Sequence, residues 1–226
     1  MMSENFLEGK FLSEGTTRFL CDVLINNNRE QCYVPCSCKL SKLIALPRDR
    51  KVLLKKNSSL LQNSLTLIAI KHKRNYIAIN ASAANTLFKN QILKRKAFNF
   101  LRGQKIYHSE YSLDGYKCDF FFEKTNTIVE LKSIITTKEI AIPFLINSKR
   151  ALRQLEAIEK YIDENYTAIY IFISFNPYTK YIELDNKNQL CNKVLDCVQK
   201  GMKLYGFSCQ FKNNELIIKK QIPIKF

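Results

Sequence analysis

The stretch EYSLDGYKCDFFFEKTNTIVELK, from Glu110 to Lys132, decides the fold that we expect for this chain. Two apolar runs, residues 116–122 and 127–134, flank four residues at 123–126, a pattern typical of two strands joined by a short turn. Both runs carry charged side chains at positions where a buried strand usually has Val or Ile. The stretch therefore predicts a β-hairpin with ionisable groups inside it.

The charged residues of this hairpin are predicted to meet on one face. Side chains alternate along a strand, so Glu130 and Lys132 share a face, and antiparallel pairing places Asp119 opposite or diagonal to Glu130. Two carboxylates suit Mg²⁺ or Mn²⁺. A simpler alternative is an ion pair between Lys132 and either carboxylate on a solvated face. The apolar neighbours favour the metal site, because buried charge needs a partner or a cation.

Composition indicates a globular protein with a polyanionic partner. The chain has 226 residues, 46% of them hydrophobic, and a net charge of +16. Such charge favours nucleic acid, with DNA and RNA both open, over an anionic membrane surface, although neutral drift towards lysine is a further explanation. We see no secretory signal and no apolar run long enough to cross a bilayer, and most of the eight cysteines lie in apolar patterns. We therefore expect a cytoplasmic protein, with a homodimer as one option.

Residues 1–79 contain short strand-like runs and no long helical pattern. The runs at 19–25, 31–35, 52–56 and 65–71 are separated by turn residues. Several short strands in so few residues predict a five-stranded oligonucleotide-binding barrel. Cys32, Cys36 and Cys38 lack the Cys-x-x-Cys spacing of structural zinc sites, so buried thiols are the simpler explanation there.

The pattern changes to mixed helix and strand from residue 80. Helical spacing over 80–98 precedes a strand around 105–112, the central hairpin, and a helix that Asn147 or Ser148 can cap and that runs to about residue 165. A buried strand at 168–175, a helix at 192–205 ending at Gly206, and strands at 207–211 and 215–220 follow. We expect an α/β (α+β) protein of two domains, 1–79 and 80–226, the second with the order αβββαβ.

That order, with Asp119 in its second strand and Glu130-Leu131-Lys132 in its third, resembles the PD-(D/E)XK nuclease core. Over nearly its full length the chain also resembles the sugar fermentation stimulation protein family. The segments that carry this resemblance are 17–23, 79–80, 84–87, 109–110, 118–120, 129–133 and 152–155.

The resemblance implies an N-terminal OB-like barrel joined to a nuclease-like domain, DNA binding without sequence specificity, and a link to sugar metabolism. Two motifs depart from the family pattern. Its Pro-Asn-Thr-Gly turn is Pro35-Cys36-Ser37-Cys38 here, and its His before the Leu-x-x-Leu of the late helix is Ala151. These changes question the role of the barrel loop and the substrate contacts of that helix.

The expected catalytic residues are Asp119, Glu130 and Lys132, with Glu110 as a further metal ligand from the preceding strand. Phosphate contacts are expected from the late helix, although a solvated helix face is an alternative, and from segments that carry the resemblance. The residues are Lys149, Arg150, Arg153 and Gln154 on the helix, and Arg18, Asn80 and Asn85 elsewhere.

The function that we expect is hydrolysis of nucleic-acid phosphodiesters with Mg²⁺ or Mn²⁺. The alternative is a catalytically inactive, DNA-binding regulator, because a fold does not settle activity. A protein scaffold is a third option, supported only by the basic charge. Clustered carboxylates favour the enzyme, because a protein that only binds an anionic backbone gains nothing from them.

Overall fold

The computed structural model describes residues 6–36, 38–45, 47–57, 64–94, 99–101, 106–144 and 148–226. Ser37, Lys105, Asn147 and the end of the first predicted helix at 95–98 lie outside these ranges.

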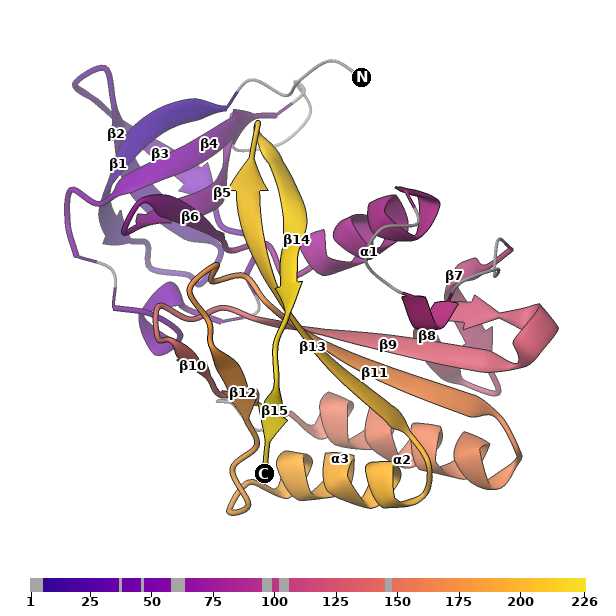
Figure 1. Cartoon of the computed structure of the whole chain (residues 1–226). Helices are drawn as coiled ribbons and strands as arrows, with labels where there is room; N and C mark the ends of the chain where they lie inside the picture. The colour runs from indigo at the N-terminus through magenta and orange to yellow at the C-terminus, as the bar shows by residue number, and fades with distance from the viewer. Residues whose placement is uncertain are drawn as a thin grey trace.

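The N-terminal part is a closed barrel of five strands, as predicted (Figure 1). Neighbours around the barrel follow the order β3-β2-β1-β4-β5, and the parallel pair Tyr33↔Thr66 between β3 and β5 closes it. Between β2 and β3, Asn26 and Asn27 both have positive φ, which suits the tight turn of a two-residue hairpin. The strands are β1 Leu7–Glu14, β2 Leu20–Ile25, β3 Asn28–Tyr33, β4 Lys51–Lys56 and β5 Leu65–His72, with β6 Asn75–Ala78 paired to β5.

The C-terminal part is built on a six-stranded mixed sheet of order β14-β13-β11-β9-β8-β7. β9, β11 and β13 run parallel, and α2 and α3 connect them across one face, while α1 lies on the other side (Figure 1). The predicted order αβββαβ corresponds to α1-β7-β8-β9-α2-β11. The bounds are α1 Ala83–Lys94, β7 His108–Leu113, β8 Tyr116–Phe122, β9 Thr127–Ile134, α2 Lys149–Asp163, β11 Thr167–Ser174, α3 Gln189–Gln199, β13 Lys203–Lys212 and β14 Glu215–Gln221.

Short elements complete the molecule. A small parallel sheet of order β10-β12-β15 lies at the edge of the C-terminal part, near the C-terminus (Figure 1). Its strands are β10 Ile140–Ala141, β12 Tyr181–Glu183 and β15 Ile224–Lys225, and the 3-10 turns are η1 Leu40–Lys42, η2 Asn99–Leu101 and η3 Glu123–Thr125.

The helix predicted over 192–205 is wrong at both ends. α3 begins after Asn188, whose side chain accepts hydrogen bonds from Leu190 N and Cys191 N, and it ends at Gln199. Gly201, not Gly206, provides the left-handed residue after the helix, with a φ of +113°. Gly206 lies in β13 instead, opposite Phe172 of β11. An added Cβ at Gly206 would lie 2.9 Å from Ile222 O, so this glycine permits close strand approach.

One buried hydrophobic cluster continues from the barrel into the C-terminal sheet. It joins barrel residues such as Leu67 and Ile77 to Phe88 of α1 and Val129 of β9. A second cluster fills the space between the other face of the sheet and helices α2 and α3. The division into 1–79 and 80–226 stays a prediction. No helix in the described part of the chain is both long and apolar enough to cross a membrane.

Candidate active site

Asp119 lies where strands β8 and β9 stop pairing. Their registered pairs end at Phe120↔Val129, and beyond this pair the Leu131 amide donates to Asp119 Oδ2 at 2.8 Å. The side chain of Asp119 thus accepts a hydrogen bond from a backbone N–H of β9. Because this bond fixes one carboxylate oxygen against β9, Asp119 is held next to Glu130 and Lys132 on the neighbouring strand.

Helix α1 fixes the other oxygen of Asp119. Asn85 Nδ2 donates to Asp119 Oδ1 at 3.0 Å, so this carboxylate is held from both the sheet and the helix. Burial raises the pKa of Asp119, while the hydrogen bonds from Leu131 and Asn85 and the charge of Lys132 oppose that rise. Each oxygen still has a lone pair for a cation, because a carboxylate oxygen accepts at two positions.

Glu130 is the most deeply buried carboxylate of the site, with 3% of its surface exposed. The Tyr116 hydroxyl donates to Glu130 Oε2 at 3.0 Å and is its side-chain partner. Burial, and then repulsion from Asp119, raises the pKa of Glu130 to about 8. Without a cation, proton binding at Glu130 is therefore favoured near neutral pH.

Lys132 lies two residues further along β9 and is half-buried. Burial lowers the pKa of its amine, whereas Glu130 and Asp119 raise it. In the described ranges Lys132 forms no ion pair within 4 Å, so the simple alternative of a direct ion pair with either carboxylate is not observed. Its Nζ lies 6.0 Å from the centre of the Phe144 ring, which covers it on one side.

Glu110, expected as a third ligand, is directed elsewhere. It is exposed, and its side chain forms an ion pair with Lys117 at 2.6 Å across the β7–β8 hairpin. Its φ of +54° is uncommon for a residue other than glycine. Glu110 is still near enough to raise the pKa of Asp119 by repulsion. In this conformation two carboxylates, not three, form the site.

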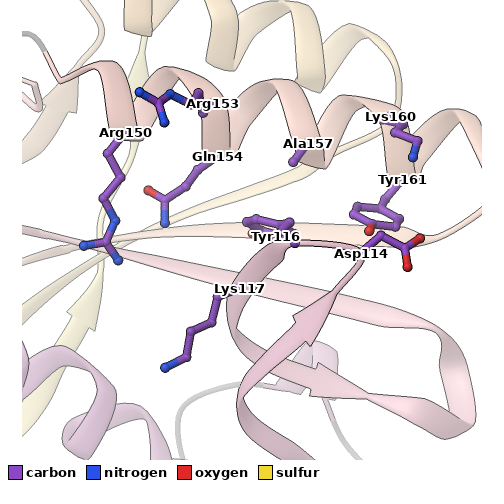
Figure 2. Close-up of a pocket in the computed structure, with 10 residues that line it drawn as sticks. Asp114, Tyr116, Lys117, Arg150, Arg153, Gln154, Ala157, Lys160 and Tyr161 are labelled. Atoms are coloured by element: carbon purple, nitrogen blue, oxygen red, sulfur yellow. The ribbon is translucent and has the colours of Figure 1, made fainter.

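The predicted phosphate contacts on α2 largely converge on one pocket. Arg150, Arg153 and Gln154 line a pocket between α2 and the β7–β8 hairpin, and Lys117 reaches it from β8 (Figure 2). Lys149 is exposed on the first turn of α2 and does not line it. The Ser148 hydroxyl caps this helix by accepting from Ala151 N, as predicted.

The remaining predicted contacts are separate from this pocket. Asn80 accepts from the backbone and hydroxyl of Ser82 just before α1, and so shapes the start of that helix. The Arg18 guanidinium stacks over the Phe19 ring at 4.5 Å, in the β1–β2 connection of the barrel. Asn85 contacts Asp119 directly.

The chain is similar to known proteins in sequence and in fold. A family model described as "Sugar fermentation stimulation protein RE domain" matches residues 82–215, more than half of the chain. The chain belongs to the sugar fermentation stimulation protein family.

Relatives in this family are distant in sequence but similar in fold. Sugar fermentation stimulation protein homologs of Natranaerobius thermophilus and Methanothermobacter thermautotrophicus are 25% and 24% identical over 178 residues. Those matches cover 75% and 77% of this chain and 72% and 73% of the relatives. The solved structure of Pyrococcus furiosus SfsA in complex with Ca²⁺ has a TM-score of 0.87 at 17% identity, covering 100% of this chain and 98% of that one. This likeness shows the fold.

The two departures from the family pattern have local explanations. Ala151, in place of the family's His, is 3% exposed and packs into the cluster beneath α2. Cys36 of the altered barrel turn is buried, and Cys38 is half-buried beside it. Ala151 and Cys36 therefore contribute to apolar packing at these two places.

The cysteines do not form the metal site that we considered for Cys32, Cys36 and Cys38. Cys32 Sγ lies 3.1 Å from Cys21 Sγ, in the cross-strand pair Cys21↔Cys32, and all eight cysteines are free. No group of three or more His, Cys, Asp or Glu side chains suited to a metal ion occurs in the described residues.

Sequence reasoning missed Tyr116 and Lys117. Tyr116 lies in an apolar run, where an aromatic side chain indicates core packing, and its hydroxyl contact with Glu130 depends on the exact hairpin register. The signal that could have identified Lys117 is its spacing from Asp119, because residues two apart on a regular strand share a face.

Proposed function

We propose that this protein hydrolyses nucleic-acid phosphodiesters with a divalent cation held by Asp119 and Glu130. The observation that carries the proposal is that the half-buried Asp119 and the buried Glu130 lie on neighbouring strands, where burial and then repulsion from Asp119 raise the pKa of Glu130, while the nearby Lys132 pairs directly with neither in the described residues. When both carboxylates are ionised, this arrangement leaves negative charge without an ion-pair partner at a largely buried place. A cation relieves that cost.

The donor chemistry of the site fits a hard divalent cation. Asp119 and Glu130 supply oxygen ligands, and Mg²⁺ typically takes one or two protein carboxylates, with waters and substrate phosphate completing the shell. The related Pyrococcus furiosus SfsA was solved in complex with Ca²⁺, which also prefers oxygen ligands. Asp119 and Glu130 are therefore sufficient as protein ligands of a divalent cation, without a third carboxylate.

Each residue then has a role that follows from its contacts. A bound cation supplies positive charge that polarises a phosphoryl oxygen. Asn85 and Leu131 N hold Asp119 in one orientation, and Tyr116 holds Glu130. Lys132, whose pKa is lowered by burial, accepts a proton from the attacking water, or in its charged form offsets charge that develops on the phosphate.

A second candidate is nucleic-acid binding without cleavage, as in a regulator of sugar-metabolism genes. The observation that favours it is the near-complete burial of Glu130, whose pKa of about 8 favours the neutral acid in the absence of a cation. A neutral Glu130 would leave only Asp119 as an anionic ligand. The basic charge of the chain supports both candidates equally.

Cleavage and binding assays separate the two candidates. Purified protein is incubated with labelled single- and double-stranded DNA and RNA in Mg²⁺, Mn²⁺ or chelator, at several salt concentrations. The proposal predicts cleavage that needs a cation, is lost in Asp119→Ala and Lys132→Ala, and is kept in Lys203→Ala, an exposed lysine at the start of β13.

Binding itself should weaken steeply with salt in all variants, because contacts to phosphates release counterions. Binding without cleavage under every condition would favour the regulator. Cleavage that persists in Asp119→Ala and in chelator would exclude the proposed site.

A further inference from the structure

The pocket between α2 and the β7–β8 hairpin has no role in holding the cation. Its volume is about 370 Å³, near the lower end of small-molecule sites, which span roughly 300–1,000 Å³. Four cationic side chains and one carboxylate line it, so it favours an anion of about nucleotide size. These charged residues are Lys117, Arg150, Arg153, Lys160 and Asp114.

Three polar side chains of the pocket are available for a ligand, namely Arg150, Arg153 and Gln154. In the described part of the chain, Arg150 and Arg153 form no ion pair within 4 Å, and Gln154 makes no side-chain hydrogen bond. Two lysines of α3 and its C-terminal end do form ion pairs with α2: Lys193 pairs with Glu159, and Lys200 pairs with Asp163. Of the four cations that line the pocket, Lys117 pairs with Glu110 and Lys160 pairs with Glu164, whereas Arg150 and Arg153 have no such partner in the described residues.

The pocket adjoins the two carboxylates. The Tyr116 ring lines the pocket, while its hydroxyl bonds Glu130 Oε2. Arg150 is near enough to Lys132 to lower the pKa of that amine by repulsion. A ligand in the pocket would therefore lie next to a phosphodiester held at Asp119 and Glu130.

Charge is distributed unevenly along the pocket. Figure 2 shows Arg150 and Gln154 extending from α2 towards Lys117 at one end, and Asp114, Tyr161 and Lys160 at the other. Asp114 and Gly115 form the hairpin turn there. One phosphate is attracted to the basic end, whereas at the other end the Asp114 carboxylate offsets the charge of Lys160, so a continuing strand would find no net positive charge there for its next phosphate.

We propose that this pocket binds the terminal phosphate of a nucleic-acid strand whose end lies beside the two carboxylates. The inference rests on the proposed function and adds a substrate class to it, namely strands with a phosphorylated end. Arg150 and Lys117 bind the phosphate through charge-assisted hydrogen bonds, and Gln154 adds a neutral donor. Lys117 is shared with Glu110, so it exchanges an exposed ion pair for the phosphate.

The test measures binding without cleavage. Fluorescence anisotropy in chelator compares one single-stranded oligonucleotide with a 5′-phosphate, a 3′-phosphate, hydroxyls at both ends, and a circular form. We expect one of the phosphorylated ends to bind at least about fivefold more tightly than the hydroxyl and circular forms. Arg150→Gln and Lys117→Gln should remove that preference, and Lys203→Gln, with the same loss of charge, should keep it.

Arg150→Lys adds a variant that keeps the charge but loses the two-pronged geometry of the guanidinium, so it should retain only part of the preference. Equal binding of all four oligonucleotides, or a preference that survives in the Arg150→Gln and Lys117→Gln double variant, overturns the inference. Cation-dependent cleavage without a preference for phosphorylated ends would overturn this inference and leave the proposed function intact. A preference for phosphorylated ends without cleavage would support this inference and overturn the proposed function. An absence of all binding would overturn both.

Discussion

The carboxylates of the site show how single residues depend on contacts from distant parts of the chain. Alternation along the strands predicted that Asp119 would come near Glu130, and extending the β8–β9 register one step places the two opposite each other. The contacts of Asn85 with Asp119 and Tyr116 with Glu130 were not predicted. Local pattern specifies which face a residue occupies, but the partner of a polar atom depends on how separate elements pack.

The first prediction concerns the charge state of Glu130. Its pKa is raised from 4.5 to about 8, so between these values the folded protein binds more protons than the unfolded chain. The free energy of unfolding therefore falls as pH rises through this window. Glu130→Gln cannot ionise, so in chelator it should become more stable than the wild type as pH increases, by on the order of a few kcal/mol.

Thermal unfolding of both proteins from about pH 5 to about pH 9 tests this prediction. The difference in Tm should widen with pH in chelator and shrink when Ca²⁺ or Mg²⁺ is added, because a cation stabilises only the carboxylate form. Curves that stay parallel across this range would show that burial does not perturb Glu130.

At the scale of elements, the hairpin was predicted to the residue and the last helix was not. Both strands of the hairpin, 116–122 and 127–134, have the expected bounds, because apolar runs and a polar turn define them locally. The predicted helix over 192–205 was shifted, because Leu204, Tyr205 and Phe207 also suit a strand and β13 pairs with both β11 and β14. Tertiary pairing decided between the two.

Strands β1, β6, β10, β12 and β15 were also missed. In β1 only Gly9 and Phe11 are buried, so its apolar alternation is weak. β6 is four residues long, and β10, β12 and β15 are two or three residues long and pair only with one another, which leaves too little pattern to detect.

The second prediction concerns the start of α3. Asn188 Oδ1 accepts from Leu190 N at 2.9 Å, and its Nδ2 donates to Phe144 O at 3.1 Å, which ties this helix to the segment that covers Lys132. Asn188→Ala removes the cap, worth about 1 kcal/mol, and the second bond, worth roughly another 1 kcal/mol. Asn188→Asp keeps the cap and loses only the donor, so it should destabilise less.

Urea unfolding measures the loss of stability, and cleavage assays measure the effect on the site. Both variants should lower activity by a similar factor, because both release Phe144 from α3, although their stabilities differ. Equal stability of the two variants would mean that the cap contributes nothing at this position.

At the scale of the whole molecule, one tyrosine connects the barrel to the C-terminal sheet. Tyr178 Oη accepts hydrogen bonds from Arg74 N at 3.2 Å and Asn75 Nδ2 at 3.0 Å, both in the β5–β6 hairpin. Beside it, Glu139 pairs with Lys73 at 2.9 Å and with Lys180 at 2.7 Å. Together with the continuous buried cluster, these bonds couple two parts that sequence reasoning treated as separate domains.

The third prediction tests that coupling. Tyr178→Phe keeps the ring, which packs edge-to-face on His72 at 5.8 Å, but removes the acceptor for both hydrogen bonds. The free energy of unfolding should fall by about 1 kcal/mol, because each bond is partly replaced by water. Amide exchange in β6 should become faster, whereas exchange in β9 and α2 should not change.

The double variant Tyr178→Phe, Glu139→Gln then shows whether the two contacts act together. If the barrel docks as one unit, both contacts are broken in the same opening step. The double variant should then lose an amount of unfolding free energy that differs from the sum of the losses in the two single variants. Cleavage of an oligonucleotide too short to reach the barrel should be unchanged, since Asp119, Glu130 and Lys132 all lie on β8 and β9. Additive losses, with uniform exchange across the chain, would instead mean that the buried cluster alone holds the barrel in place.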